Sequence, residues 1–135
     1  MAGYSGTPLW KKLGYRPGSR ALVLGGPPGY RKLLELPALV KVTWLARRTK
    51  GMGFVHVFSA SAQALKVELA RLRREIAPDG MVWVSWPKKA SRVPTDVTED
   101  RIREIALPMG FVDVKVCAVD DTWSGLKLMV RRTER

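Results

Sequence analysis

Residues that could bind a ligand cluster in loops after the predicted strands rather than in one continuous motif. These loops bring together rings, cations, carboxylates and a hydroxyl: Tyr30, Trp86, Lys88, Lys89, Arg92, Asp120, Asp121, Trp123 and Ser124. Rings stack on flat groups, and Lys or Arg side chains pair with negative charge. The set predicts binding of an anionic or aromatic ligand. A structural alternative stays open, in which the tryptophans close the core and the lysines are solvated.

Few residues suit acid–base, nucleophilic or metal chemistry. One histidine, His56, and one cysteine, Cys117, exclude two-histidine sites, an intramolecular disulfide and cysteine-rich zinc sites. We expect His56 to be a packed strand residue satisfied by a neighbour, and Cys117 to act as a small hydrophobe. Asp120 and Asp121 form an acidic pair in a short loop, where local hydrogen bonds are a commoner role than catalysis. No catalytic residue and no metal ligand is assigned.

The chain is strongly basic. Its 135 residues include 24 Lys and Arg against 12 Asp and Glu, which gives a net charge of +12. Such a charge attracts polyanions over long distances, so nucleic acid is an alternative partner. The cations fall in short groups, such as Arg31-Lys32 and Lys88-Lys89, and no zinc-finger, RNA-recognition or basic-zipper motif accompanies them. Solvated basic faces would explain the same charge.

Length and hydropathy predict one domain over residues 1–135. Hydrophobic residues make up 46% of the chain, enough for a core, and no apolar run approaches the roughly 18 residues that span a bilayer. Lys11 and Lys12 interrupt the N-terminus before a signal-peptide apolar region forms. We expect a cytoplasmic, bacterial-type protein without membrane contact, either a monomer or a homodimer.

The predicted elements alternate between strands and helices. Helices are expected at Thr7–Gly14, Tyr30–Leu36 and Ser61–Ala77 and after Thr98, strands at Ala21–Leu24, Val40–Ala46, Gly53–Ser59 and Met81–Trp86, and a hairpin of Phe111–Val119 with Leu126–Arg132. This order predicts a three-layer α/β fold. Its sheet has about six strands, is mostly parallel, and ends in a C-terminal antiparallel hairpin. We expect residues 1–19 to form a helical lead-in.

Two details of this fold carry explicit expectations. The connection Arg47–Met52 is short for a parallel crossover, so either a bare extended crossover or a local antiparallel pair turning at Gly51–Gly53 is open. In the hairpin, Val112, Val114 and Val116 are expected on one side of their strand, with Asp113 and Lys115 on the other.

Three segments carry a family resemblance. Pro17–Gly25 resembles the first strand and glycine loop of class I S-adenosylmethionine-dependent methyltransferases, which have a Rossmann-like fold. Leu72–Val84, reading LRREIAPDGMVWV, resembles the family's Pro-Gly turn and following strand, and Leu107–Arg132 resembles its closing hairpin. The resemblance implies a ligand site at the carboxyl ends of the strands. That face would be formed by Gly25, Gly26, Gly29, Tyr30, Trp86, Lys88, Lys89, Arg92, Asp121, Trp123 and Ser124.

The residues by which that family holds its cofactor are missing. Val23 stands where the family has a carboxylate, Pro27 replaces the middle glycine, and the segment after the second strand, Trp44–Arg48, has no acid for a ribose. Pro27 and Pro28 also remove two backbone N–H donors. The resemblance thus implies a degenerate, non-catalytic domain without a cofactor. S-adenosylmethionine and an active methyltransferase stay as alternatives.

A second resemblance covers the whole chain. Tyr4–Leu9, Ser85–Ser91 and Asp120–Lys127 resemble a small bacterial domain-of-unknown-function family of similar length, which implies no activity. The N-terminal segment around Tyr4 and Trp10 is expected to fold over the strand-end face, unless it is a frayed terminus.

Overall fold

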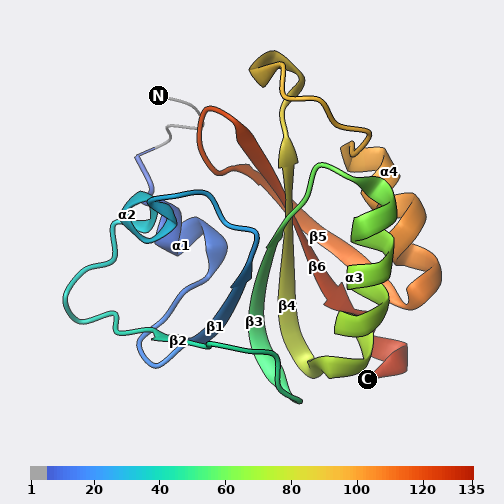
Figure 1. The fold of residues 1–135 in the computed structure, drawn as a ribbon. Coiled ribbons are helices and arrows are strands. Elements are labelled where there is room, and N and C mark those ends of the chain that lie inside the picture. The colour runs from blue at the N-terminus through green and yellow to red at the C-terminus, as the bar shows by residue number, and fades with distance from the viewer. Residues whose placement is uncertain (1–5) are drawn as a thin grey trace.

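A six-stranded sheet organises residues 6–135, the part of the chain that the computed structural model describes (Figure 1). The elements are α1 (Leu9–Leu13), β1 (Arg20–Leu24), α2 (Tyr30–Leu34), β2 (Thr43–Trp44), β3 (Met52–Phe58), α3 (Ala62–Glu75), β4 (Ile76–Pro87), α4 (Glu99–Ala106), β5 (Phe111–Ala118) and β6 (Trp123–Val130), with 3₁₀ turns at Lys89–Ser91, Leu107–Met109 and Arg132–Glu134. The strand order is β2-β1-β3-β4-β6-β5. Strands β1 to β4 are parallel, and β6 and β5 add an antiparallel hairpin. The predicted fold class is confirmed.

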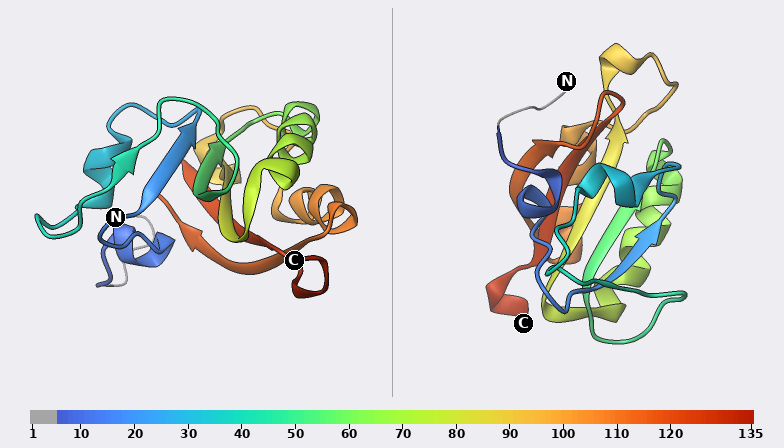
Figure 2. Two further views of the ribbon diagram at one scale, coloured as in Figure 1. Left: turned by 90° about the horizontal axis from the view of Figure 1, so that it is seen from below. Right: turned by 90° about the vertical axis from the view of Figure 1, so that its left-hand side faces the viewer.

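Helices cover both faces of the sheet, which gives three layers (Figure 2). Helices α3 and α4 lie on one face, where Leu65, Leu69 and Leu72 are fully buried at the predicted helical spacing. Helices α1 and α2 lie on the other face, against Phe54 and Trp83. Alternate strand residues supply the two core clusters because successive side chains point to opposite faces.

Helix ends follow the local sequence with two corrections. Ser61 and Thr98 cap α3 and α4 by accepting from backbone N–H groups three residues on. The helix expected from Thr7 begins instead at Leu9, with Pro8 at the N-cap position. Helix α3 ends at Glu75, two residues before the prediction, since Pro78 disfavours a helical residue before it and the chain enters β4 directly.

The strand expected at Val40–Ala46 is shorter in the structure, where β2 covers Thr43–Trp44. It pairs with β1 in parallel, through Thr43 N–H to Ser19 C=O at 2.8 Å and Leu45 N–H to Ala21 C=O at 2.8 Å. The alternative of an antiparallel pair with β3 is wrong, because β1 lies between them.

The connection from β2 to β3 contains no helix, and the side chain of Arg48 anchors it to α3. Arg48 forms ion pairs with Glu68 and Glu75 of that helix. The Arg48 guanidinium holds the pKa of Glu75 below its usual range. An extended connection of this length therefore replaces the helix of an ordinary parallel crossover.

The predicted alternation along β5 is wrong. The register shifts between Asp113 and Lys115, which puts Asp113 opposite Leu128 and Val116 opposite Leu126. The irregularity at Val114 therefore puts Asp113 and Val116 on one face, while Val112, opposite Met129, lies on the other. Strand β5 is the edge of the sheet, so Val112, Val114 and Val116 stay 37%, 48% and 46% exposed.

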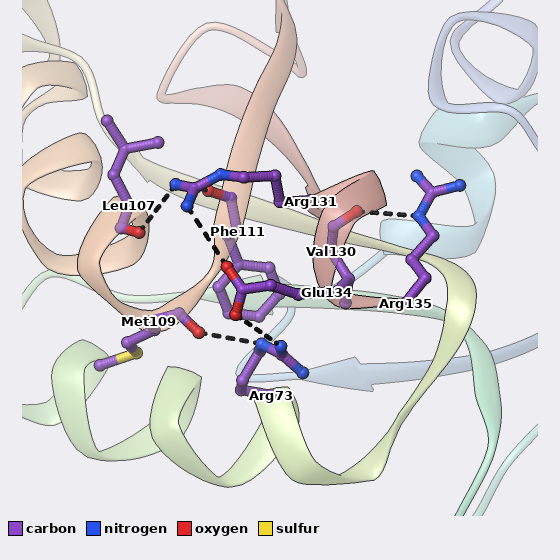
Figure 3. A network of polar contacts seen from close by, with 8 residues as sticks. All are labelled: Arg73, Leu107, Met109, Phe111, Val130, Arg131, Glu134 and Arg135. Carbon is purple, nitrogen blue, oxygen red and sulfur yellow. Dashed lines mark hydrogen bonds and ion pairs between the residues drawn. The ribbon is translucent and has the colours of Figure 1, made fainter.

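The C-terminal turn latches α3 to the end of the hairpin (Figure 3). Glu134 forms ion pairs with Arg73 and Arg131, each at 3.3 Å. Arg73 Nε also donates to the Met109 carbonyl at 2.9 Å, and Arg131 Nη2 to the Leu107 carbonyl at 3.1 Å. The latch thus ties three segments that are distant in sequence.

Gly110 lies under this latch, and its replacement by alanine should loosen it. Gly110 has φ +97°, and a Cβ there would come within 2.5 Å of Glu134 Oε1 and 3.0 Å of Arg73 Nε. We expect Gly110→Ala to lower the free energy of unfolding by about 2–3 kcal/mol in urea titration, of which the left-handed backbone accounts for about 1–2. Gly51→Ala is the matched control, since φ is +76° and no atom lies within 4 Å. Equal losses in both variants would contradict the latch.

Candidate functional site

A cavity of about 500 Å³ opens between α2 and β2, beside the glycine loop. It is lined by Ala21, Val23, Gly26, Pro27, Gly29, Tyr30, Arg31, Lys32, Trp44 and Leu45. These residues come from β1, from β2 and the residue after it, from the loop after β1, and from the first turn of α2, where Arg31 and Lys32 are exposed at the rim. Strand β2 is the edge of the sheet, and the crossover that follows it is bare, so the cavity borders that edge.

The glycine loop is folded back tightly onto the strand ends. A Cβ on Gly25 would lie 2.9 Å from the Phe58 carbonyl oxygen, and one on Gly26 would lie 2.7 Å from Val23 Cγ1. Val23, the residue at the position of the family's carboxylate, therefore packs under the loop. Gly29 has φ +78° and turns the chain into α2. This geometry fixes the loop that borders the cavity.

The charge of the cavity wall is positive. Arg31 and Lys32 are exposed, and the Arg31 guanidinium lies 4.7 Å from the centre of the half-buried Trp44 ring. None of the ten described lining residues carries a carboxylate. A guanidinium stacked on an indole offers both a flat surface and a charge-assisted donor to an anion.

A row of buried polar side chains, joined by hydrogen bonds, connects the first residue of α2 to the sheet. The Tyr15 and Tyr30 hydroxyls are 2.8 Å apart, Tyr30 Oη is 2.7 Å from His56 Nδ1, and His56 Nε2 is 2.7 Å from Ser85 Oγ. Burial lowers the pKa of His56 to about 3 and raises the pKa of Tyr30, so both are neutral. The predicted packed role of His56 is confirmed. Because Tyr30 is the first residue of α2, this chain fixes the start of the helix.

Several predicted residues lie at the end of the sheet where β4 ends and β6 begins, either in these strands or in the loops beyond them. Trp86 is 9% exposed and packs in the core beneath α3 and α4, whereas Trp123 packs edge-on against Phe58 on the opposite face, at 5.1 Å between ring centres. Lys88 Nζ donates to the Asp120 carbonyl at 2.7 Å. Asp120 Oδ1 accepts from two backbone N–H groups of its own loop, the local role predicted for it.

The remaining predicted residues lie around the exposed loops at that end. Lys89 and Arg92 follow β4 in and after a 3₁₀ turn, and Arg92 adopts a left-handed conformation with φ +61°. Asp121 is exposed in the hairpin loop, and Ser124 lies opposite Trp86 in the sheet. Of the whole predicted set, the cavity takes in Gly26, Gly29 and Tyr30.

Among the cavity residues that sequence reasoning missed are the two cations and the indole, Arg31, Lys32 and Trp44. The sequence held a signal for Trp44 alone. Trp44 begins the segment in which the resembled family has its ribose-binding acid, and this chain has no acid there. The described part of the N-terminal segment lies elsewhere than expected. Helix α1 packs on the middle of the sheet, where the Leu13 carbonyl accepts from Trp83 Nε1 at 2.8 Å, and Tyr4 falls outside the described residues.

Within residues 6–135, no group of three or more His, Cys, Asp or Glu side chains is arranged to hold a metal ion. No helix in this part of the chain is both long and apolar enough to cross a membrane.

Solved structures match the fold. No protein-family model and no curated protein matches the sequence. A SAM-dependent methyltransferase from Aquifex aeolicus superimposes with a TM-score of 0.64 and 15% identity over 89% of this chain and 86% of that chain. A putative type 11 methyltransferase from Sulfolobus solfataricus gives 0.60 and 15%, over 91% and 89%. LepI in complex with SAM gives 0.58 and 10%, and there the match covers 93% of this chain but 47% of that chain.

These likenesses establish the class of fold. The chain has a methyltransferase-like, Rossmann-like α/β fold, with a mostly parallel sheet that ends in antiparallel strands. At such low identity, the comparison defines architecture and leaves activity to the site itself.

Proposed function

We propose that this chain is a non-catalytic methyltransferase-like domain that binds an anionic, ring-bearing small ligand in the cavity between α2 and β2. The observation that carries the proposal is the lining of that cavity, which brings Arg31, Lys32 and Trp44 together without a carboxylate among its described residues. Cations at the rim attract negative charge, and a stacked ring binds a flat group. A nucleotide has both features.

S-adenosylmethionine fits this lining poorly. The cofactor carries a sulfonium cation and an ammonium group, and its ribose hydroxyls need a carboxylate acceptor. Here Arg31 and Lys32 face the cavity instead, and Val23 packs beneath Gly26. No step of methyl transfer is therefore derived from this site. Lys89 and Arg92, at the same end of the sheet, stay a prediction of further contacts to the ligand.

Two probes that share adenosine separate these functions. Adenosine monophosphate carries a phosphate, and S-adenosylhomocysteine carries a zwitterionic amino acid with no net charge. In isothermal titration at moderate salt, we expect the monophosphate to bind at least tenfold more tightly. The double variant Arg31→Ala/Lys32→Ala should weaken its binding about 10- to 100-fold, as expected when one or two charge-assisted hydrogen bonds are lost.

A matched variant controls for net charge. Arg71→Ala/Arg74→Ala removes two exposed cations from α3, away from the cavity, and should change the affinity less than twofold. Tighter binding of S-adenosylhomocysteine than of the monophosphate would overturn the proposal in favour of a methyltransferase. Absence of binding of both probes up to millimolar concentration would also overturn it.

A further inference from the structure

The positive charge of the chain is divided unevenly along its length. Residues 1–60 hold ten of the 24 Lys and Arg but one of the 12 Asp and Glu, so they carry +9 of the net +12. These residues build α1, β1, α2, β2 and β3. In Figure 1, the segments up to β2 lie together on one side of the molecule, in blue to teal. The excess charge is thus concentrated around one edge of the sheet.

In residues 61–135 the acidic side chains nearly balance the basic ones, with 11 Asp and Glu against 14 Lys and Arg. Within residues 6–135, every carboxylate in a described ion pair belongs to α3, α4, β5 or the C-terminal turn. Arg48 is the one cation from residues 6–60 that reaches them. Eight exposed cations of residues 6–60 form no ion pair with a described residue. They are Lys11, Arg16, Arg20, Arg31, Lys32, Lys41, Arg47 and Lys50.

Several of these cations lie next to β2, the edge strand that contributes to the cavity. Lys41 and Arg47 flank the two residues of β2, and Arg20 pairs in register with Thr43 of that strand. Arg31 and Lys32 stand on the opposite rim. One phosphate can engage the rim cations, but the cations along β2 lie outside the lining of the cavity. A ligand with a single phosphate therefore leaves them unused, whereas a chain of phosphates can engage both sets.

We infer that the ligand is single-stranded nucleic acid, with one base in the cavity and its phosphates running along the cations of α2 and β2. This inference rests on the anion-binding function proposed above and names the partner. A single strand fits because its bases are free to stack on rings and guanidinium planes, such as the Arg31–Trp44 pair. In a duplex the base faces are already stacked on one another, so the cavity would stay empty.

The test uses fluorescence anisotropy of a labelled 12-nucleotide oligoadenylate, compared with adenosine monophosphate. We expect the oligonucleotide to bind at least tenfold more tightly than the monophosphate. Lys41→Ala/Arg47→Ala should weaken oligonucleotide binding about tenfold and leave monophosphate binding unchanged. The slope of log affinity against log salt should shrink by about 0.7 for each phosphate contact removed. Arg31→Ala/Lys32→Ala should weaken both ligands.

Each contrary outcome identifies what fails. Equal affinity for oligonucleotide and monophosphate, or no effect of Lys41→Ala/Arg47→Ala, overturns the nucleic-acid inference but leaves the proposed function standing. An equal loss of oligonucleotide binding in Arg71→Ala/Arg74→Ala reduces the effect to net charge and overturns the inference. The same strand can also be annealed to oligouridylate to form a duplex. If the protein binds this duplex as tightly as the free strand, the single-strand assignment is overturned. If the monophosphate does not bind at all, the proposed function itself falls.

Discussion

Replacing Trp83 with alanine should lower the free energy of unfolding by about 3–5 kcal/mol, the usual cost of removing a large buried ring. Trp83 is completely buried in the middle of β4. Its indole Nε1 donates to the Leu13 carbonyl at 2.8 Å, and this carbonyl belongs to the last residue of α1. The alanine variant therefore leaves both a cavity and an unpaired buried carbonyl. Urea titration followed by circular dichroism measures the loss.

Two further variants separate packing from hydrogen bonding. Trp83→Phe keeps most of the ring but removes the donor, so it should cost about 1–3 kcal/mol. Trp10→Ala, at a half-exposed position on α1, should cost less than about 1 kcal/mol. If Trp83→Ala costs no more than Trp10→Ala, α1 is not held on the sheet as described.

Acidification from pH 7.5 to 5 should remove about 2 kcal/mol of stability through His56 alone. Burial lowers the pKa of His56 to about 3, whereas in the unfolded chain it titrates near 6.5. Below pH 6.5, His56 is therefore protonated in the unfolded state but stays neutral in the folded state. The contribution is complete above that pH and is lost toward pH 3, by about 1.4 kcal/mol per pH unit. The groups closest to His56 are hydroxyls and rings, none of them charged in this range.

The variant His56→Gln isolates this contribution from the carboxylates. Glutamine can still hydrogen-bond to Tyr30 or Ser85 but does not titrate. The gap in unfolding free energy between the wild-type chain and the variant should narrow by about 2 kcal/mol between pH 7.5 and 5. Urea titrations at both pH values measure it. A gap that stays constant would show that His56 is protonated in the folded state or already neutral in the unfolded one.

Most of the fold could be predicted because its signals are local. The spacing of Leu65, Leu69 and Leu72 defined α3, and the apolar run of β3 marked a strand buried on both faces. The alternative that the sequence left open and the error it made both depend on tertiary contacts. The crossover after β2 is held by Arg48 on two glutamates of α3, a contact that spans at least 20 positions of sequence. The irregularity at Val114 depends on pairing with β6, which no local pattern encodes.

The candidate site was only partly predictable for a related reason. The strand-end rule named Gly26, Gly29 and Tyr30, which line the cavity, because loops after parallel strands meet at one edge. It missed Arg31 and Lys32 because they belong to the helix after the loop, and Trp44 because it lies within β2 itself. The rule also could not tell that Trp86 and Trp123 pack on opposite faces of the sheet, since that depends on the register between β4 and β6.

The irregularity in β5 also bears on how these molecules behave at high concentration. An edge strand exposes unpaired backbone groups, and valines on such a strand favour addition of a strand from a neighbouring molecule. Strand β5 has three partly exposed valines, but the break at Val114 interrupts the ladder in its middle, next to the charged Lys115. A second chain therefore cannot align along the full length of this edge, so one extra residue in the strand helps to keep the protein from forming continuous intermolecular sheets.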